Sequence, residues 1–152
     1  MRSGILHDNM ISWLYRELYF LTNQKGDWQL DKTVFYEGDI PFVDVSWGRT
    51  KELVGKFCDA HSDNFLMKIT EYLPGYIHSK HVHTHQEETI FVLSGRGYSE
   101  TESGRAELTP GCVSFIPAGV YHATCNPYDE VLRVLIVKTP PDDTSIYSER
   151  QK

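Results

Sequence analysis

Residues 75–95 of the chain read GYIHSKHVHTHQEETIFVLSG, and this stretch decides the fold. Four of the seven histidines in the sequence lie between positions 78 and 85. His81 and His83 are two residues apart, so both imidazoles leave the same face if the segment is a β-strand. Glu88 follows after a short turn, and the β-branched and aromatic residues behind it are typical of a second strand. The stretch therefore predicts a corner between two strands where imidazole and carboxylate side chains meet.

A later stretch, residues 111–126, reads GCVSFIPAGVYHATCN and supplies a third imidazole. Pro117 and Gly119 predict a turn that presents His122 from a later strand. Three neutral imidazoles and one carboxylate suit a divalent first-row metal ion. Fe(II) and Mn(II) are favoured because they accept a mixed nitrogen and oxygen shell, and Ni, Co, Cu and Zn remain alternatives.

The two stretches together resemble the cupin superfamily. The first fits the pattern G-x5-H-x-H-x4-E-x6-G, and the second fits G-x5-P-x-G-x2-H-x3-N, with 15 residues between them. The resemblance implies an all-β fold, the cupin double-stranded β-helix or jelly-roll barrel, over residues 53–138. It also implies that one divalent metal ion per chain is bound by four residues: His81, His83, Glu88 and His122.

The choice of carboxylate depends on spacing. The family pattern allows three or four residues between the second histidine and the glutamate, so Glu87 and Glu88 both qualify. Counting back six residues from Gly95 favours Glu88. His78 and His85 flank the motif, and we interpret them as solvated histidines of a loop or rim rather than as ligands.

Two other features receive structural interpretations. His61 and Asp63 form an H-x-D pair that resembles half of a facial triad. The pair lies in a run of turn residues, so it is the weaker metal-site hypothesis. Tyr121 precedes His122 and should point away from it by strand alternation, which favours packing in the core.

The remainder of the chain predicts the architecture around these motifs. Short β-prone runs alternate with glycine, proline and asparagine turns, as in a sandwich or barrel. Apolar residues at helical spacing over residues 8–21 predict an amphipathic helix. Residues 1–52 are therefore expected to form an N-terminal helical extension with β pieces that packs on the barrel, and residues 139–152 a polar C-terminal tail. The predicted strands are Leu53–Phe57, Phe65–Leu73, Lys80–His83, Thr89–Leu93, Arg96–Glu100, Arg105–Leu108, Cys112–Ile116, His122–Cys125 and Val131–Val137.

Composition limits the partners and the cellular compartment that we expect for the protein. The formal charge of −6 disfavours nucleic acid as a partner. The first 25 residues hold no apolar run of signal-peptide or membrane-span length, so a membrane is not expected either. Three cysteines without paired-motif spacing predict free thiols in the cytoplasm, although a bridge between Cys112 and Cys125 stays open. The aromatic surface of residues 10–21 predicts a homodimer.

The leading functional hypothesis is a metal-dependent cupin enzyme that acts on a small organic molecule, with an Fe(II)-type dioxygenase as the first candidate. A non-redox lyase, decarboxylase, cyclase or isomerase is the alternative within the enzymes, because the cupin fold does not fix the reaction. A non-catalytic cupin that binds or senses a small molecule is the alternative outside them. The sequence identifies no catalytic residue beyond the metal ligands and no organic cofactor.

Overall fold

A computed structural model describes residues 33–142 of the chain. Contacts between Cα atoms divide the chain into two units, Met1–Val34 and Phe35–Lys152, and every strand described below belongs to the second. The helix predicted over residues 8–21 and most of the predicted C-terminal tail lie outside the described residues.

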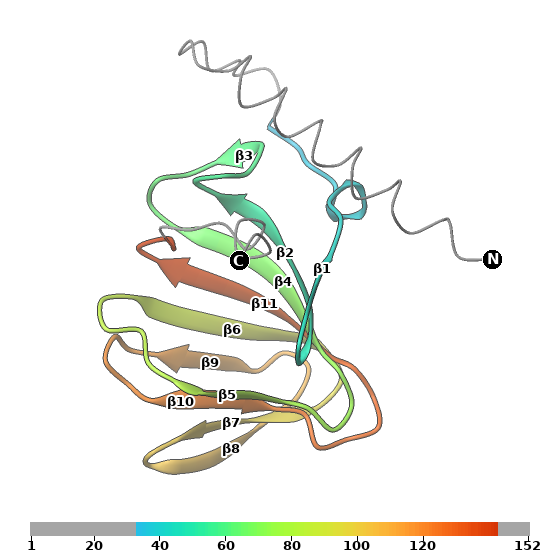
Figure 1. The fold of residues 1–152 in the computed structure, drawn as a ribbon, viewed down its shortest axis with the longest axis vertical. Coiled ribbons are helices and arrows are strands. Elements are labelled where there is room, and N and C mark those ends of the chain that lie inside the picture. Colours follow the sequence, from blue (N-terminus) through green and yellow to red (C-terminus); the bar gives the residue numbers. More distant parts are fainter. Residues whose placement is uncertain (1–32, 143–152) are drawn as a thin grey trace, which may run out of the picture. The chain divides into compact units, whose positions relative to one another are not determined.

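The described residues form two antiparallel sheets, as the sequence predicts for an all-β protein (Figure 1). The larger sheet has the strand order β1-β2-β4-β11-β6-β9, with β3 pairing in parallel with β2, and the smaller has the order β5-β10-β7-β8. A single 3-10 turn, η1 (Glu37–Asp39), precedes the strands of this region. The strands are β1 (Val43–Val45), β2 (Gly48–Gly55), β3 (Ala60–His61), β4 (Leu66–Tyr72), β5 (Ile77–His81), β6 (Glu87–Ser94), β7 (Gly97–Thr101), β8 (Gly104–Leu108), β9 (Val113–Ile116), β10 (His122–Cys125) and β11 (Leu132–Thr139).

The core follows from the alternation of side chains along the central strands. In β11 every second residue is buried, and its buried residues lie opposite buried residues of β6, for example Val134 opposite Val92 and Ile136 opposite Ile90. β-Branched side chains pack well on such a pleated surface. The buried apolar cluster consists of Tyr72, Ile90, Val92, Leu108, Ile116, Leu132, Val134 and Ile136.

The larger sheet begins earlier in the chain than residue 53. Strand β2 starts at Gly48 and pairs with β4 along its length. Its first residues are polar, so they give no hydrophobic strand signal. They are held instead by cross-strand polar contacts: the hydroxyl groups of Thr50 and Thr70 lie 2.9 Å apart, and Arg49 pairs with Glu71 at 2.6 Å.

Two residues of the sequence motifs have structural roles. Gly95 has a φ of +76°, and a Cβ atom built there would lie 2.1 Å from the carbonyl oxygen of Val131. Any other residue would therefore clash at the turn after β6. Asn126 is fully buried, and its side-chain amide donates hydrogen bonds to the carbonyl oxygens of Tyr72 and Glu130 at 2.9 and 2.7 Å. The asparagine thereby ties the loop before β11 to the end of β4.

All three cysteines are free thiols, so the bridge between Cys112 and Cys125 that the sequence left open does not form. Within residues 33–142, no helix has the length and apolar character needed to cross a membrane.

Candidate metal centre

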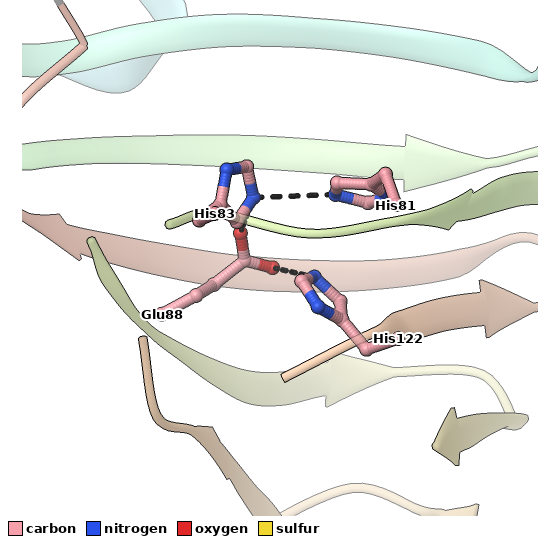
Figure 2. Close-up of side chains that lie close together, drawn as sticks. All are labelled: His81, His83, Glu88 and His122. Atoms are coloured by element: carbon pink, nitrogen blue, oxygen red, sulfur yellow. Dashed lines mark hydrogen bonds and ion pairs between the residues drawn. The ribbon is translucent and has the colours of Figure 1, made fainter. Parts of the chain in front are cut away.

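Four side chains that the sequence separates by up to 41 positions meet at one point inside the fold (Figure 2). Each offers one ligand atom, and these atoms all lie within 4.8 Å of one another. They are His81 at the end of β5, His83 in the loop that follows, Glu88 at the start of β6 and His122 at the start of β10. The structure therefore brings together all four residues that were predicted as metal ligands.

Strand register and one loop contact position these residues. His122 lies directly across from His81 in the pairing of β10 with β5. Strand β5 ends at His81, so the prediction that His83 shares its strand is wrong. His83 is held in the loop because its carbonyl oxygen accepts a hydrogen bond of 2.8 Å from the backbone N–H of Gly119. Gly119 has a φ of +81°, a conformation that glycine adopts without strain, and it begins the turn that leads to His122.

Backbone acceptors orient two of the imidazoles. The Nδ1 atoms of His81 and His122 lie 2.8 and 3.0 Å from the carbonyl oxygens of Ser79 and Val120. In the neutral rings Nδ1–H donates to these carbonyls, which leaves the lone pair on Nε2 to face the centre. Outer contacts of this kind commonly fix the tautomer and the ring direction of metal-binding histidines.

The potential ligand atoms lie close together at the centre. The Nε2 atoms of His81 and His83 lie 3.2 Å apart, and His83 Nε2 lies 3.2 Å from Glu88 Oε2. His122 Nε2 lies 3.9 Å from Glu88 Oε1 (Figure 2). Glu88 and His122 are almost completely buried, whereas His81 and His83 are only half-buried. The cluster therefore has a closed side and a side that solvent reaches.

Charged neighbours keep the buried carboxylate ionised. Burial alone would raise the pKa of Glu88, but the hydrogen bond from His83 and the charges of Lys138 and Lys68 lower the pKa of Glu88 to about 2. Lys138 Nζ lies 3.5 Å from Glu88 Oε2, and both side chains are buried. Burial and the neighbouring imidazoles also lower the pKa of His81, so its ring is neutral at pH 7.

A divalent cation fits this arrangement. His122 Nε2 is buried and has no hydrogen-bond partner among the described residues, and it faces an ionised carboxylate. A buried lone pair next to an anion is unfavourable unless a cation or a donor lies between them. Three neutral imidazoles and one carboxylate form a donor set for a first-row divalent ion. The unsatisfied nitrogen is thus the observation that favours a metal at this position.

The other candidates remain outside the cluster. Glu87 is exposed next to the buried Glu88, and His85 is exposed in the loop before β6. His61 and Asp63 lie 3.2 Å apart on the surface, and they do not belong to the one group of potential metal ligands found within residues 33–142. Tyr121 is 49% exposed, so the prediction that it packs in the core is wrong.

Sequence reasoning missed the residues that surround the centre. The ring of His78 lies 4.4 Å from that of His81 and 4.4 Å from that of Trp47, so it is packed between them rather than solvated. Burial, and to a smaller degree the neighbouring imidazole of His81, lower the pKa of His78 to about 3, and its ring is neutral at pH 7. Lys68 and Lys138 also escaped notice. The alternation of buried residues in β11, which ends at Lys138, is the signal that could have found it.

These features define a class of protein. Two antiparallel sheets enclose an apolar core, and one end of that core carries three histidines and a glutamate from β5, β6, β10 and a loop. Residues 68–138 match the family described as the cupin domain. This part of the chain is therefore similar to a cupin domain, in agreement with the two sequence motifs.

Several known proteins are similar to this chain in sequence or in fold. An uncharacterized protein of Streptomyces coelicolor is 39% identical over 57 residues, a match that covers 38% of this chain and 53% of that protein. The chain thus spans about half the length of this relative. Among solved structures, KdgF from a Halomonas species has a TM-score of 0.65 and 18% identity, covering 74% of this chain and 96% of its own. The polyketide cyclase RemF from Streptomyces resistomycificus has a TM-score of 0.63 and 22% identity, with coverages of 72% and 80%. At these identities the likeness concerns the fold.

Proposed function

We propose that this protein is a metal-dependent enzyme that acts on a small organic molecule. The observation that carries the proposal is the asymmetry of the cluster: Glu88 and His122 are buried, while His81 and His83 are half-buried. A structural metal site is usually closed and rich in cysteine, whereas this donor set contains none and is partly open to solvent. An open site with a few converging polar groups above an apolar core is typical of small-molecule chemistry.

An Fe(II)-dependent dioxygenase is the first candidate reaction. The four residues would hold the ion, and bound iron would supply oxygen activation. The protein's own contribution is to keep the donors ready: His81 and His122 are oriented through their Nδ1 atoms, and Glu88 is kept ionised by Lys138. Such preorganisation lowers the cost of assembling a site during the reaction.

Metal analysis followed by oxygen uptake tests this proposal. Protein purified without added metal is analysed for Fe, Mn, Co, Ni, Cu and Zn. It is then reloaded anaerobically with Fe(II) and mixed with a panel of small organic acids, diols and phenols in an oxygen electrode. We expect about one metal ion per chain and oxygen consumption with at least one member of the panel. Protein that takes up no divalent metal would contradict the enzyme proposal as a whole.

A non-redox lyase, cyclase or isomerase is the second candidate, and His78 is the observation that favours it. Its neutral imidazole lies beside His81 at the half-buried side of the cluster, where it can form a hydrogen bond with a bound molecule. The same panel, followed by product analysis under nitrogen, separates the two reactions. Turnover without oxygen that is lost in His78→Phe, with unchanged metal content, would select the non-redox class. Saturable binding of a panel compound without any product would instead indicate a non-catalytic binding cupin.

We also propose that the protein is a cytoplasmic homodimer. The residues first considered for the dimer, 10–21, lie outside the described residues, but a second surface supports the proposal. Phe91, Val113 and Phe115 are 38%, 60% and 56% exposed on β6 and on β9, the last strand of the larger sheet. Neighbouring apolar side chains at a sheet edge are typical of contacts between copies. Light scattering should give a dimer mass that Phe115→Glu reduces to 17.5 kDa.

A further inference from the structure

Lys68 is carried on the interior face of the larger sheet. Its side chain leaves β4 on the same face as those of Thr70 and Tyr72, which are 0% and 1% exposed. In the pairing of β4 with β11 it lies opposite Ile136, one inward position from Lys138. The β4 strand thus directs an ammonium group toward the end of the core that holds the metal cluster.

The two interior lysines differ in their partners. Lys138 Nζ lies 3.5 Å from Glu88 and 3.7 Å from Asp142, so its charge is balanced by two carboxylates. Lys68 makes no hydrogen bond or ion pair within the part of the chain that the structure describes. Glu52 lies directly across from it in β2 and is buried, and the charges of Glu52, Glu88 and Asp142 act on Lys68. An interior cation without a close partner is costly unless something else approaches it.

A metal ion would change the balance of charge at this end of the barrel. The described charged groups around the cluster are two lysines, Lys68 and Lys138, and three carboxylates, those of Glu52, Glu88 and Asp142. A divalent ion added to this set leaves one positive charge in excess. A single carboxylate neutralises that excess, whereas a phosphate monoester dianion would overshoot it.

Lys68 is exposed to a degree similar to that of two of the imidazoles. His81, His83 and Lys68 are half-buried, while Glu88, His122 and Lys138 are buried. Of the two lysines, Lys68 is thus the one that solvent reaches, and its charge acts on Glu88 of the cluster. Burial and the charge of Lys138 lower the pKa of Lys68 to about 8, so its amine is still mostly protonated at pH 7.

We propose that Lys68 binds a carboxylate of the substrate beside the metal centre, so that the substrate is a small organic acid. This inference rests on the proposed function, because it places the rest of the acid at the metal. Lysine suits the task as a compact point charge on a flexible stem, which accepts carboxylates at a range of positions. Exposed Lys80, next to His81 on β5, provides a matched control for general charge effects.

The test uses Co(II)-loaded full-length protein and two sets of probes, whose binding is followed by the visible Co(II) spectrum and by calorimetry. The first set is the dicarboxylates oxalate, malonate, succinate and glutarate, and the second is monocarboxylates of equal chain length. We expect at least one dicarboxylate to bind wild type about tenfold more tightly than Lys68→Met, a factor that corresponds to one well-placed ionic contact. The monocarboxylates should bind both proteins equally, and Lys68→Arg should recover part of the difference.

Each other outcome has a defined meaning. If Lys68→Met and wild type bind every dicarboxylate equally at equal cobalt content, the carboxylate subsite is overturned and the proposed enzyme function stands. An equal loss in Lys80→Met would likewise overturn it, because the effect would then be one of general charge. Wild type that fails to hold cobalt would overturn the proposed function instead. Should Lys68→Met not fold, Lys68→Gln provides the same comparison.

Discussion

The same two strands build the most apolar and the most polar parts of the interior. Along β6 and β11, Ile90 lies opposite Ile136 and Val92 opposite Val134, and all four side chains are at most 2% exposed. In the next inward-facing pair along the strands, Glu88 lies opposite Lys138, and these side chains are also buried, at 4% and 6% exposure. The difference teaches that the apolar end can fix the backbone, while the polar end, where buried charges need compensation, holds the candidate metal ligands.

The largest effect is expected at the apolar end. Ile90→Ala removes a side chain that is completely buried between two sheets, so it should lower the free energy of unfolding by about 3 kcal/mol. Urea denaturation monitored by circular dichroism measures this loss. The metal content of the folded fraction should be unchanged. If the folded protein also lost metal, the stability of the apolar end and metal binding at the polar end would not be independent.

The next effect is expected at the polar end. There a substitution should lower metal affinity and leave the fold intact. His122→Ala removes the imidazole whose Nε2 lacks a partner, so metal affinity should fall on the order of 100-fold or more, beyond what outer contacts contribute. Competition with a chromogenic chelator measures the affinity. The β-rich circular dichroism spectrum should persist, because β10 is held by strand pairs on both sides. Full metal occupancy in both His81→Ala and His122→Ala would refute the single site.

A smaller effect concerns the ion pair between Lys138 and Glu88 in metal-free protein. The folded pKa of Glu88 is about 2, below its ordinary 4.5, so its contribution to stability is complete above pH 4.5 and is lost as the pH falls toward 2. Lys138→Met should raise the pKa of Glu88 by about one unit. In this variant the contribution of Glu88 to stability is smaller at pH 7. As the pH falls, it is lost at a higher pH than in wild type. Side-chain NMR titration provides the measurement, with Lys80→Met as the control, and an unchanged pKa would contradict the assigned cause.

The smallest effect is expected for Glu87, which lies next to Glu88 but is exposed. Glu87→Ala should change metal content by less than about twofold, because an exposed carboxylate contributes little at a buried centre. Glu88→Ala is its matched partner and should lose most of the metal. Elemental analysis of the two proteins side by side decides between them, and the reverse result would exchange the two carboxylates in our assignment.

The sequence predicted the strands whose hydrophobic pattern is strong. The bounds predicted for β10 match those observed, and β4 and β11 differ by one or two residues at their ends. It did not predict the start of β2, because Arg49 and Thr50 pair through polar contacts that leave no apolar pattern. The hydrophobic pattern of a sequence predicts strands that are buried in a core better than strands that pair through polar side chains.

For the site, the sequence predicted the four residues that converge but not their surroundings. Alternation places His78 and His81 on opposite faces of β5, yet their rings lie 4.4 Å apart. The reason is an irregularity in the pairing of β10 with β5 between His122 and Thr124, since a bulge of this kind redirects side chains. Lys68 escaped because its inward direction depends on the register of β4, which a single sequence does not display.

The hydrogen bond between the N–H of Gly119 and the carbonyl oxygen of His83 bears on how such a centre can change over evolutionary time. This hydrogen bond joins main-chain atoms, so it can form whatever side chain replaces that of His83. The ligand side chain at position 83 can therefore change without a change in the conformation of the loop. A lineage that exchanges His83 or Glu88 for another donor can alter its metal preference in one step while keeping the barrel intact. Protein engineers can use the same freedom to install a new metal in this scaffold.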